Sequence, residues 1–198
     1  MTIETTKRFA DIDRSRIESA VAEIIAALPV DAESEGLRDT PSRIARMYAE
    51  VFSGLAEDPQ VVLQSGFEEG YDEMVVARDI EFTSICEHHF LPFFGVVHIG
   101  YLPRGRIVGI SKLARVTDIL ARRPQVQERL TMQIVDTLVD VLQPMGAAVV
   151  VEAEHTCMTG RGVRKQGSRI ITSVNRGVFR EDARTRAEFL GLIGHAAR

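Results

Sequence analysis

The stretch Ile80-Glu81-Phe82-Thr83-Ser84-Ile85-Cys86-Glu87-His88-His89 joins a strand-like run to a group of metal-binding residue types. The second of the chain's two cysteines lies far downstream, in Glu154-His155-Thr156-Cys157. A Cys-x-x-His pair and a distant cysteine together supply three zinc ligands. Structural zinc sites usually have four protein ligands, whereas catalytic sites leave one position for water. The pattern therefore predicts a catalytic zinc site built from two separate segments.

Two other interpretations of the cysteines remain open. Proteins often bury a free cysteine as a small apolar residue, and a disulfide between Cys86 and Cys157 would require an oxidising compartment. The clustering favours a metal, because three of the chain's five histidines lie within three residues of a cysteine. The pattern does not distinguish His88 from His89 as the third ligand, since both lie on a predicted turn. His98 and His195 have no cysteine nearby. We expect His98 to be a strand residue and His195 to lie in the C-terminal tail.

Composition restricts the class of protein. A chain of 198 residues with 45% hydrophobic and 26% charged residues is typical of a globular domain with its own core. The formal net charge of −4 argues against general nucleic-acid binding, which requires a basic face. No apolar run approaches the roughly 20 residues of a membrane span. The N-terminus does not resemble a signal peptide, so we expect a cytoplasmic protein.

Hydrophobic periodicity predicts the order of helices and strands. We expect helices over 13–28, from Thr40-Pro41 to near Gly54, and over 112–121, 124–142 and 181–193. Strands are expected over 74–82, 93–101, 147–153 and 168–174, and residues 56–72 are expected to form a loop. Thr40 and Ser111 are predicted helix N-caps, and Pro124 is predicted to open the longest helix.

This order predicts an α+β fold with an antiparallel sheet, because the strands occur in adjacent pairs with short links. Four strands covered by two helices leave both edges of the sheet open. Proteins commonly remove open edges by pairing or by closing a barrel, so we expect the chain to assemble with copies of itself. The predicted division is an N-terminal helical region, 1–55, and one functional unit, 56–198.

Basic residues surround the candidate site. Lys112 and Arg115 share a helix face, and with Ser111 and the free amides of the helix start they would hold phosphate oxygens. The alternative is a solvated helix face. Arg161 follows Cys157 within a glycine-flanked turn, and Arg43 lies in the first turn of the second helix, where it is either functional or a solvated surface charge.

Acid–base groups accompany the predicted ligands. The histidine of the His88-His89 pair that does not bind metal, together with His155, would move protons. Glu128 stands in the polar run Gln125-Val126-Gln127-Glu128-Arg129. Its carboxylate either favours the helix dipole or accepts paired hydrogen bonds from a guanine-like N–H edge.

A series of motifs, in the same order over roughly residues 13 to 194, resembles the GTP cyclohydrolase I family. They are Thr40-Pro41-Ser42-Arg43, Cys86-Glu87-His88-His89, Gly109-Ile110-Ser111-Lys112-Leu113-Ala114-Arg115, Arg123-Pro124-Gln125-Val126-Gln127-Glu128-Arg129-Leu130-Thr131, His155-Thr156-Cys157 and Gly177-Val178-Phe179-Arg180.

The resemblance implies a tunnelling fold (T-fold), with a ββααββ core, an N-terminal helical pair and a C-terminal helix, assembled as a homodecamer of two face-to-face pentamers. It implies a zinc-dependent hydrolase that converts GTP to formate and 7,8-dihydroneopterin triphosphate, the entry to folate or tetrahydrobiopterin synthesis.

The resemblance also implies a role for each matching residue. The zinc ligands would be Cys86, His89 and Cys157, the catalytic residues His88, His155 and Ser111, and the substrate-binding residues Gln127, Glu128, Lys112, Arg115, Arg161 and Arg43. Gln127 and Glu128 would hold the guanine. Arg43 would reach the site from elsewhere in the assembly.

Two other function classes remain alternatives. A non-catalytic binding or assembly protein of the same fold would hold a purely structural metal, and it would need neither spare histidines nor a basic cluster. A nitrile reductase acting on a deazaguanine would need a cysteine nucleophile free of metal.

Overall fold

The computed structural model describes residues 12–194, and His195 lies outside them. Contacts between Cα atoms divide the chain into two compact units, with the boundary between Glu57 and Asp58. In the first unit, α1 (Arg14–Ala26) begins at Asp13, whose carboxylate caps the backbone N–H of Arg16. It packs on α2 (Thr40–Val51), burying Val21 and Ile25. The short helix η1 (Ser53–Ala56) follows α2.

The second unit contains one five-stranded sheet in the order β5-β2-β3-β6-β7. Its elements are α3 (Pro59–Leu63), β1 (Phe67–Glu68), β2 (Val75–Cys86), β3 (Leu91–Leu102), β4 (Arg106–Ile107), α4 (Ile110–Ala121), β5 (Pro124–Gln125), α5 (Gln127–Leu142), β6 (Gly146–His155), α6 (Thr156–Thr159), β7 (Ile170–Gly177), α7 (Val178–Glu181) and α8 (Ala183–Gly194). The four long strands pair antiparallel, and only β5 pairs parallel, with the end of β2. The expected mixture of helices and an antiparallel sheet is present.

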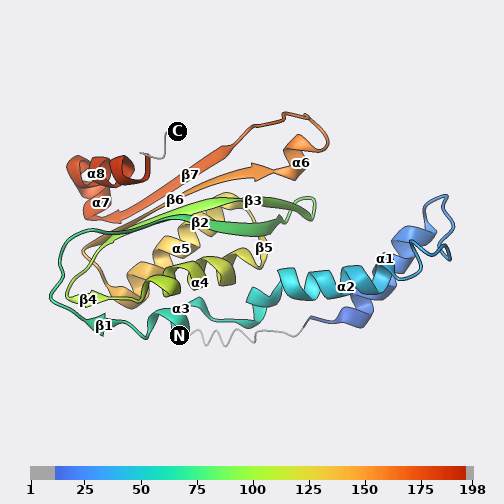
Figure 1. Cartoon of the computed structure of the whole chain (residues 1–198), viewed down its shortest axis with the longest axis horizontal. Coiled ribbons are helices and arrows are strands. Elements are labelled where there is room, and N and C mark those ends of the chain that lie inside the picture. The colour runs from blue at the N-terminus through green and yellow to red at the C-terminus, as the bar shows by residue number, and fades with distance from the viewer. Residues whose placement is uncertain (1–11, 195–198) are drawn as a thin grey trace, which may run out of the picture. The chain divides into compact units, whose positions relative to one another are not determined.

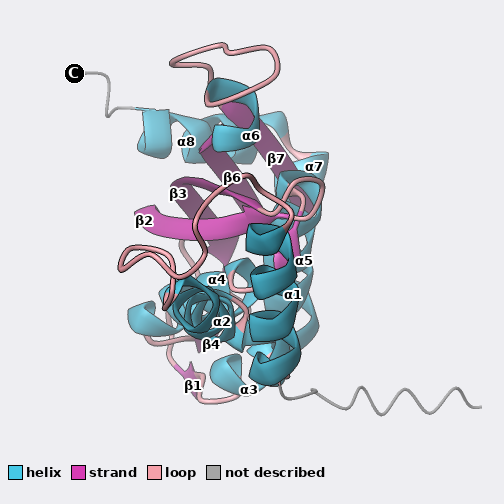
Figure 2. Ribbon diagram, turned by 90° about the vertical axis from the view of Figure 1, so that its right-hand side faces the viewer, coloured by secondary structure: helices cyan, strands magenta, loops and turns pink. Residues whose placement is uncertain are grey.

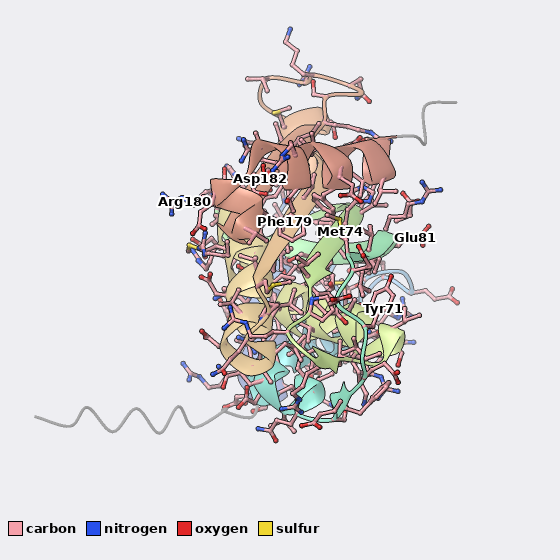
Figure 3. All side chains as sticks on the ribbon, turned by 90° about the vertical axis from the view of Figure 1, so that its left-hand side faces the viewer. Tyr71, Met74, Glu81, Phe179, Arg180 and Asp182 are labelled. Carbon is pink, nitrogen blue, oxygen red and sulfur yellow. The ribbon has the colours of Figure 1, made fainter. Side chains whose placement is uncertain are left out.

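Helices cover the sheet on both faces (Figures 1 and 2). The larger apolar cluster joins the sheet to α4 and α5, with fully buried residues such as Val97, Leu113 and Leu138. A smaller cluster on the opposite face contains Phe179 and Phe189 of α7 and α8, with Met74 packed against it. Figure 3 shows Phe179 and Met74 on this side of the sheet, with Arg180 and Asp182 nearby. None of the helices within 12–194 is long and apolar enough to cross a membrane.

Both long edges of the sheet are open in this part of the chain. β7 pairs only with β6, and β5 reaches only Ile85 and Cys86 at the end of β2. The outer edge of β2 from Val75 to Ser84 and that of β7 therefore have no strand partner among residues 12–194.

Several predicted boundaries are wrong, and the two in β2 and β5 are wrong because of pairing with distant parts of the chain. The strand expected over 74–82 continues to Cys86, since it pairs with β3 throughout and the Ser84 hydroxyl donates to the carbonyl of Ala121 (2.7 Å). Pro124 begins no helix but the short strand β5, and α5 starts at Gln127. Asp39 and Gly109, rather than Thr40 and Ser111, occupy the N-cap positions of α2 and α4.

Close packing of β3 on β6 depends on Gly95. A Cβ at this position would lie 1.9 Å from the carbonyl oxygen of Glu152. Only glycine fits such an approach of two backbones. Gly95 pairs with Ala153, two residues before His155, so this contact fixes the end of β6 against β3.

His98 of β3 is buried beside a bulge in β2, and this predicts a loss of stability in acid. Its Nδ1 accepts a hydrogen bond from the backbone N–H of Asp79 (3.2 Å), whose φ is +58°. Burial lowers the pKa of His98, against the opposing effect of the Asp79 and Glu152 carboxylates, and Arg78 lowers it further. The folded-state pKa is therefore below the unfolded value of about 6.5, so the unfolded chain binds more protons in this range.

Stability from His98 is complete above about pH 6.5 and falls as the pH drops through the folded-state pKa. Urea unfolding of the wild type and of His98→Gln, between about pH 5 and 8, checks this expectation. The glutamine keeps an acceptor for Asp79 without a titrating ring. Equal pH slopes in the two proteins would contradict the assignment.

Candidate metal centre

Cys86, His89 and Cys157 come together at one end of the sheet. Their ligand atoms all lie within 4.8 Å of one another. Cys86 is the last residue of β2, His89 lies on the turn into β3, and Cys157 lies in α6 directly after β6. β2 and β6 both pair with β3, so both ligand segments emerge at the same end of neighbouring strands (Figure 1).

The donor set fits a soft or borderline cation such as zinc. Two thiols and one imidazole are common zinc ligands, and three protein ligands leave a fourth position open. Burial and the neighbouring Cys86 thiol raise the pKa of the Cys157 thiol, while Arg161 acts in the opposite direction. A bound cation would act in the same direction as Arg161 and favour the thiolate form of Cys157.

His88 and His155 flank the three candidate ligands. His88 is exposed, and its Nδ1 lies 3.9 Å from Cys86 Sγ. His155 is half-buried and stacks on Phe93, with ring centroids 4.5 Å apart and planes 5° apart. Burial lowers the pKa of His155, and the Glu128 carboxylate opposes this shift. The structure thus places both predicted proton-transfer residues around the metal cluster.

Gln127 and Glu128 lie at the start of α5, next to this cluster. The Gln127 side chain is only 2% exposed, and its Oε1 lies 2.8 Å from His155 Nε2. Glu128 is exposed in the first turn of the helix. Arg161, in the loop after α6, donates from Nη1 to Nε2 of His89 (3.0 Å).

Ser111 and Lys112 lie far from the metal cluster within one chain. They begin α4, and the last residue of that helix, Ala121, accepts the hydrogen bond from Ser84 near the metal-binding turn. At 1.5 Å per residue the helix separates its two ends by about 16 Å. Arg115 follows one turn after Lys112. Arg43 belongs to the other compact unit, where its guanidinium lies 3.4 Å from the Asp39 carboxylate.

An ion pair that sequence reasoning did not single out supports the turn that carries the candidate ligand His89. Arg129 of α5 holds the Glu87 carboxylate with two hydrogen bonds, of 2.6 and 2.8 Å. Hydrogen bonding from Arg129 lowers the pKa of Glu87. This two-pronged ion pair, called the fork below, fixes the turn that carries His88 and His89 against the first turn of α5. In the sequence, only the opposite charges of Glu87 and Arg129 indicate the pair.

Arg129→Lys is expected to speed metal release by about tenfold, because residues that orient metal ligands commonly affect affinity by 10- to 100-fold. Lysine keeps the charge but not the two-pronged geometry. Release to a chromophoric chelator measures the rate. Arg169→Lys is the matched control, since Arg169 also pairs with a glutamate, Glu152 (2.7 Å), outside the metal-binding turn. Equal release rates in the two variants would show that the fork does not support the site.

Comparisons with known proteins give a consistent family. A family model described as GTP cyclohydrolase I matches residues 17–194. The chain is 56% identical over 186 residues to GTP cyclohydrolase 1 of Thermobifida fusca, covering 93% of this chain and 90% of the relative. It is 56% identical over 187 residues to GTP cyclohydrolase 1 of Rhodopirellula baltica, covering 94% of this chain and 82% of that relative. It is 55% identical over 185 residues to GTP cyclohydrolase 1 of Dehalococcoides mccartyi, covering 92% of this chain and 98% of that relative.

A solved structure, that of the archaeosine synthase QueF-Like in its apo form, matches 52% of this chain and 93% of its own. The sequence identity is 16% and the TM-score 0.40, which is too low to establish a shared fold.

Proposed function

The chain belongs to the GTP cyclohydrolase I family, and from that premise we propose that it hydrolyses and rearranges GTP to formate and 7,8-dihydroneopterin triphosphate at the metal cluster. The observation that carries the proposal is the convergence of Cys86, His89 and Cys157, within 4.8 Å, beside two further histidines. A purely structural metal would not need those histidines. The product would enter folate or tetrahydrobiopterin synthesis.

Cys86, His89 and Cys157 would hold zinc. A zinc ion there would supply a water of lowered pKa, and thus a nucleophile near neutral pH. Cys86 ends β2 and Cys157 lies in α6 directly after β6, and both strands pair with β3, so the chain brings the two thiols together before any ion binds. A nitrile reductase mechanism would need one of these cysteines free, and their shared position in the cluster disfavours it.

The histidines would carry the protons. During water attack on C8 of the guanine, a histidine that protonates N7 makes C8 more electrophilic. The later steps, in which the imidazole ring opens, formate leaves and the ribose rearranges, each need a proton donor and an acceptor. His88 and His155 flank the cluster and would serve these steps, with the Ser111 hydroxyl as a further proton carrier.

Gln127 and Glu128 would determine the choice of base. The exposed Glu128 carboxylate is suited to accept paired hydrogen bonds from the N–H edge of guanine, an arrangement that adenine does not offer. The buried carboxamide of Gln127 faces His155 rather than solvent. Its contribution to the guanine end would accordingly pass through that histidine.

Basic residues would anchor the triphosphate. Arg161 lies beside His89 and is exposed in its loop. Ser111 and Lys112 stand about one helix length from the cluster of their own chain, and Arg115 is one turn nearer, so we infer that all three serve the cluster of a neighbouring copy. Arg43 would be contributed in the same way. Such charge-assisted contacts would hold C8 over the metal.

The open edges of β2 and β7 support a proposal that the chain assembles into a ring. Pairing of these edges between copies would satisfy their backbone groups. We propose a tunnelling fold with a ββααββ core, in a homodecamer of two pentamers, with residues 56–198 as the catalytic unit and 1–55 as a helical region. Thiol ligands require a reducing compartment, and the cytoplasm provides one.

Incubation of the purified protein with GTP, followed by oxidation and pterin fluorescence, tests the proposal. We expect stoichiometric formate and a fluorescent pterin, loss of both after chelation, and recovery on adding zinc but not magnesium. ATP should give no product. A protein that binds zinc and GTP but releases no formate would be a binding protein, and the proposed function would be wrong.

A further inference from the structure

Gln127 is held by an unusually complete set of hydrogen bonds inside the chain. Its Nε2 lies 3.1 Å from the carbonyl oxygen of Val151, 2.9 Å from that of Ile170 and 3.1 Å from Thr172 Oγ1. Its Oε1 lies 2.8 Å from His155 Nε2. These partners come from β6 and β7, so two strands hold one carboxamide at the start of α5.

The chemistry of these partners fixes the orientation of the carboxamide. Backbone carbonyls only accept hydrogen bonds, so the group facing Val151 and Ile170 must be the NH₂. A flipped amide would direct Oε1 at two carbonyl oxygens in a buried place, which costs the energy of unpaired polar groups.

The neighbouring hydroxyls agree with this orientation. Thr131 Oγ1 donates its proton to the backbone carbonyl oxygen of Gln127 (2.8 Å). The 2.6 Å contact between the hydroxyls of Thr131 and Thr172 must therefore use the proton of Thr172. The lone pairs of Thr172 then face the NH₂ of Gln127.

An oriented Oε1 also fixes the proton of His155. Because Oε1 can only accept, Nε2 of His155 must carry a hydrogen in both the neutral and the charged ring. In the neutral ring the lone pair is therefore on Nδ1. No hydrogen bond to Nδ1 occurs among residues 12–194, and stacking on Phe93 holds the plane of the ring.

The geometry points to Gln127 as the positioning residue that sets the tautomer of His155, so that His155 takes up and returns its catalytic proton at Nδ1 only. The inference rests on the proposed function for the role of His155 but not for its tautomer. When Nδ1 gains a proton the ring becomes a cation that still donates from Nε2 to Gln127. When Nδ1 gives that proton to the substrate, the neutral Nε2–H form returns. The Nε2 proton never leaves.

Nitrogen-15 NMR of histidine-labelled, zinc-loaded full-length protein tests the inference, since protonated and bare ring nitrogens have well-separated shifts. At about pH 8.5, two units above the usual histidine pKa, we expect His155 to show a protonated Nε2 and a bare Nδ1. Loss of signals in His155→Phe assigns them. A protonated Nδ1 in the neutral wild-type ring would overturn the inference, and this measurement needs no variant that alters Gln127.

Gln127→Met gives the second arm. Without the acceptor, the His155 signals should shift towards a mixture of tautomers, and kcat should fall by about 10- to 100-fold with KM changed by less than kcat. Gln125→Met is the matched control, because Gln125 is also a buried carboxamide, bound to Leu120 and Gln133 and not to His155. It should leave the His155 signals unchanged. Unchanged signals in Gln127→Met would overturn the inference.

The two claims fail separately. Formate release with a protonated Nδ1 would remove the inference and keep the proposed function. A protein that shows the expected tautomer but no turnover would keep the inference about the tautomer and remove the proposed function.

Discussion

Replacing Cys157 by serine is expected to remove bound metal and to lower the rate of formate release by at least about a thousandfold. A serine hydroxyl stays protonated near neutral pH and is a poor ligand for a borderline cation, and two remaining donors do not hold zinc tightly. Cys157 is the better choice of the two cysteines. It is only half-buried in the short helix α6, whereas Cys86 is 4% exposed at the end of β2, where a polar replacement would also disturb the core.

Metal content by elemental analysis and formate release by a coupled assay measure the two effects. Met158→Leu changes the adjacent residue of the same helix and is expected to keep both metal and turnover. A Cys157→Ser protein that retains one metal per chain at full activity would exclude this residue as a ligand.

Replacing His155 or His88 by alanine should separate metal binding from chemistry. Neither residue belongs to the cluster formed by Cys86, His89 and Cys157, so metal content should stay near that of the wild type. Turnover should fall by about 10²- to 10⁴-fold, the usual range for the loss of a general acid or base. The larger loss is expected for His155, whose ring is held on two sides by Phe93 and Gln127.

Formate release and metal content measured on the same samples distinguish the outcomes. His98→Gln is the control, because His98 lies in the middle of β3 with its hydrogen bond to Asp79, and we expect its turnover to match the wild type. If the His88 or His155 variant lost metal as well, that histidine would support the ligands rather than move protons.

The sequence was sufficient for the long elements and for the metal cluster. A continuous β-branched run identified the strand over 147–153, and four-residue spacing of apolar residues identified the longest helix. The clustering of cysteines and histidines predicted one site that joins the two segments, but it left His88 and His89 open as the third ligand, and the choice of His89 came from the family resemblance. The boundaries failed where tertiary contacts override local signals. Pro124 has the chemistry of a first helical residue, but pairing of Gln125 with Cys86 extends it into a strand.

The interior of the site was less predictable. Gln127 stands in a polar run at a helix start, so its sequence suggests a solvent-facing side chain. The residues that bury it, Val151, Ile170 and Thr172, are distant in the chain and bond mainly through backbone oxygens, which carry no sequence signal. The separation of Lys112 from the cluster likewise depends on the direction of α4 relative to the sheet, which no periodicity encodes.

The placement of the two cysteines also has a consequence for how the chain unfolds. Because they terminate β2 and enter α6 after β6, any ion between them works as a removable cross-link that closes a loop of roughly 70 residues, comparable to a disulfide across the same span. An ion that binds only the folded chain at a thousandfold excess over its dissociation constant adds about 4 kcal/mol to the free energy of unfolding. If the cluster binds a metal as proposed, a cell short of that metal would lose molecules to denaturation and proteolysis as well as losing their activity.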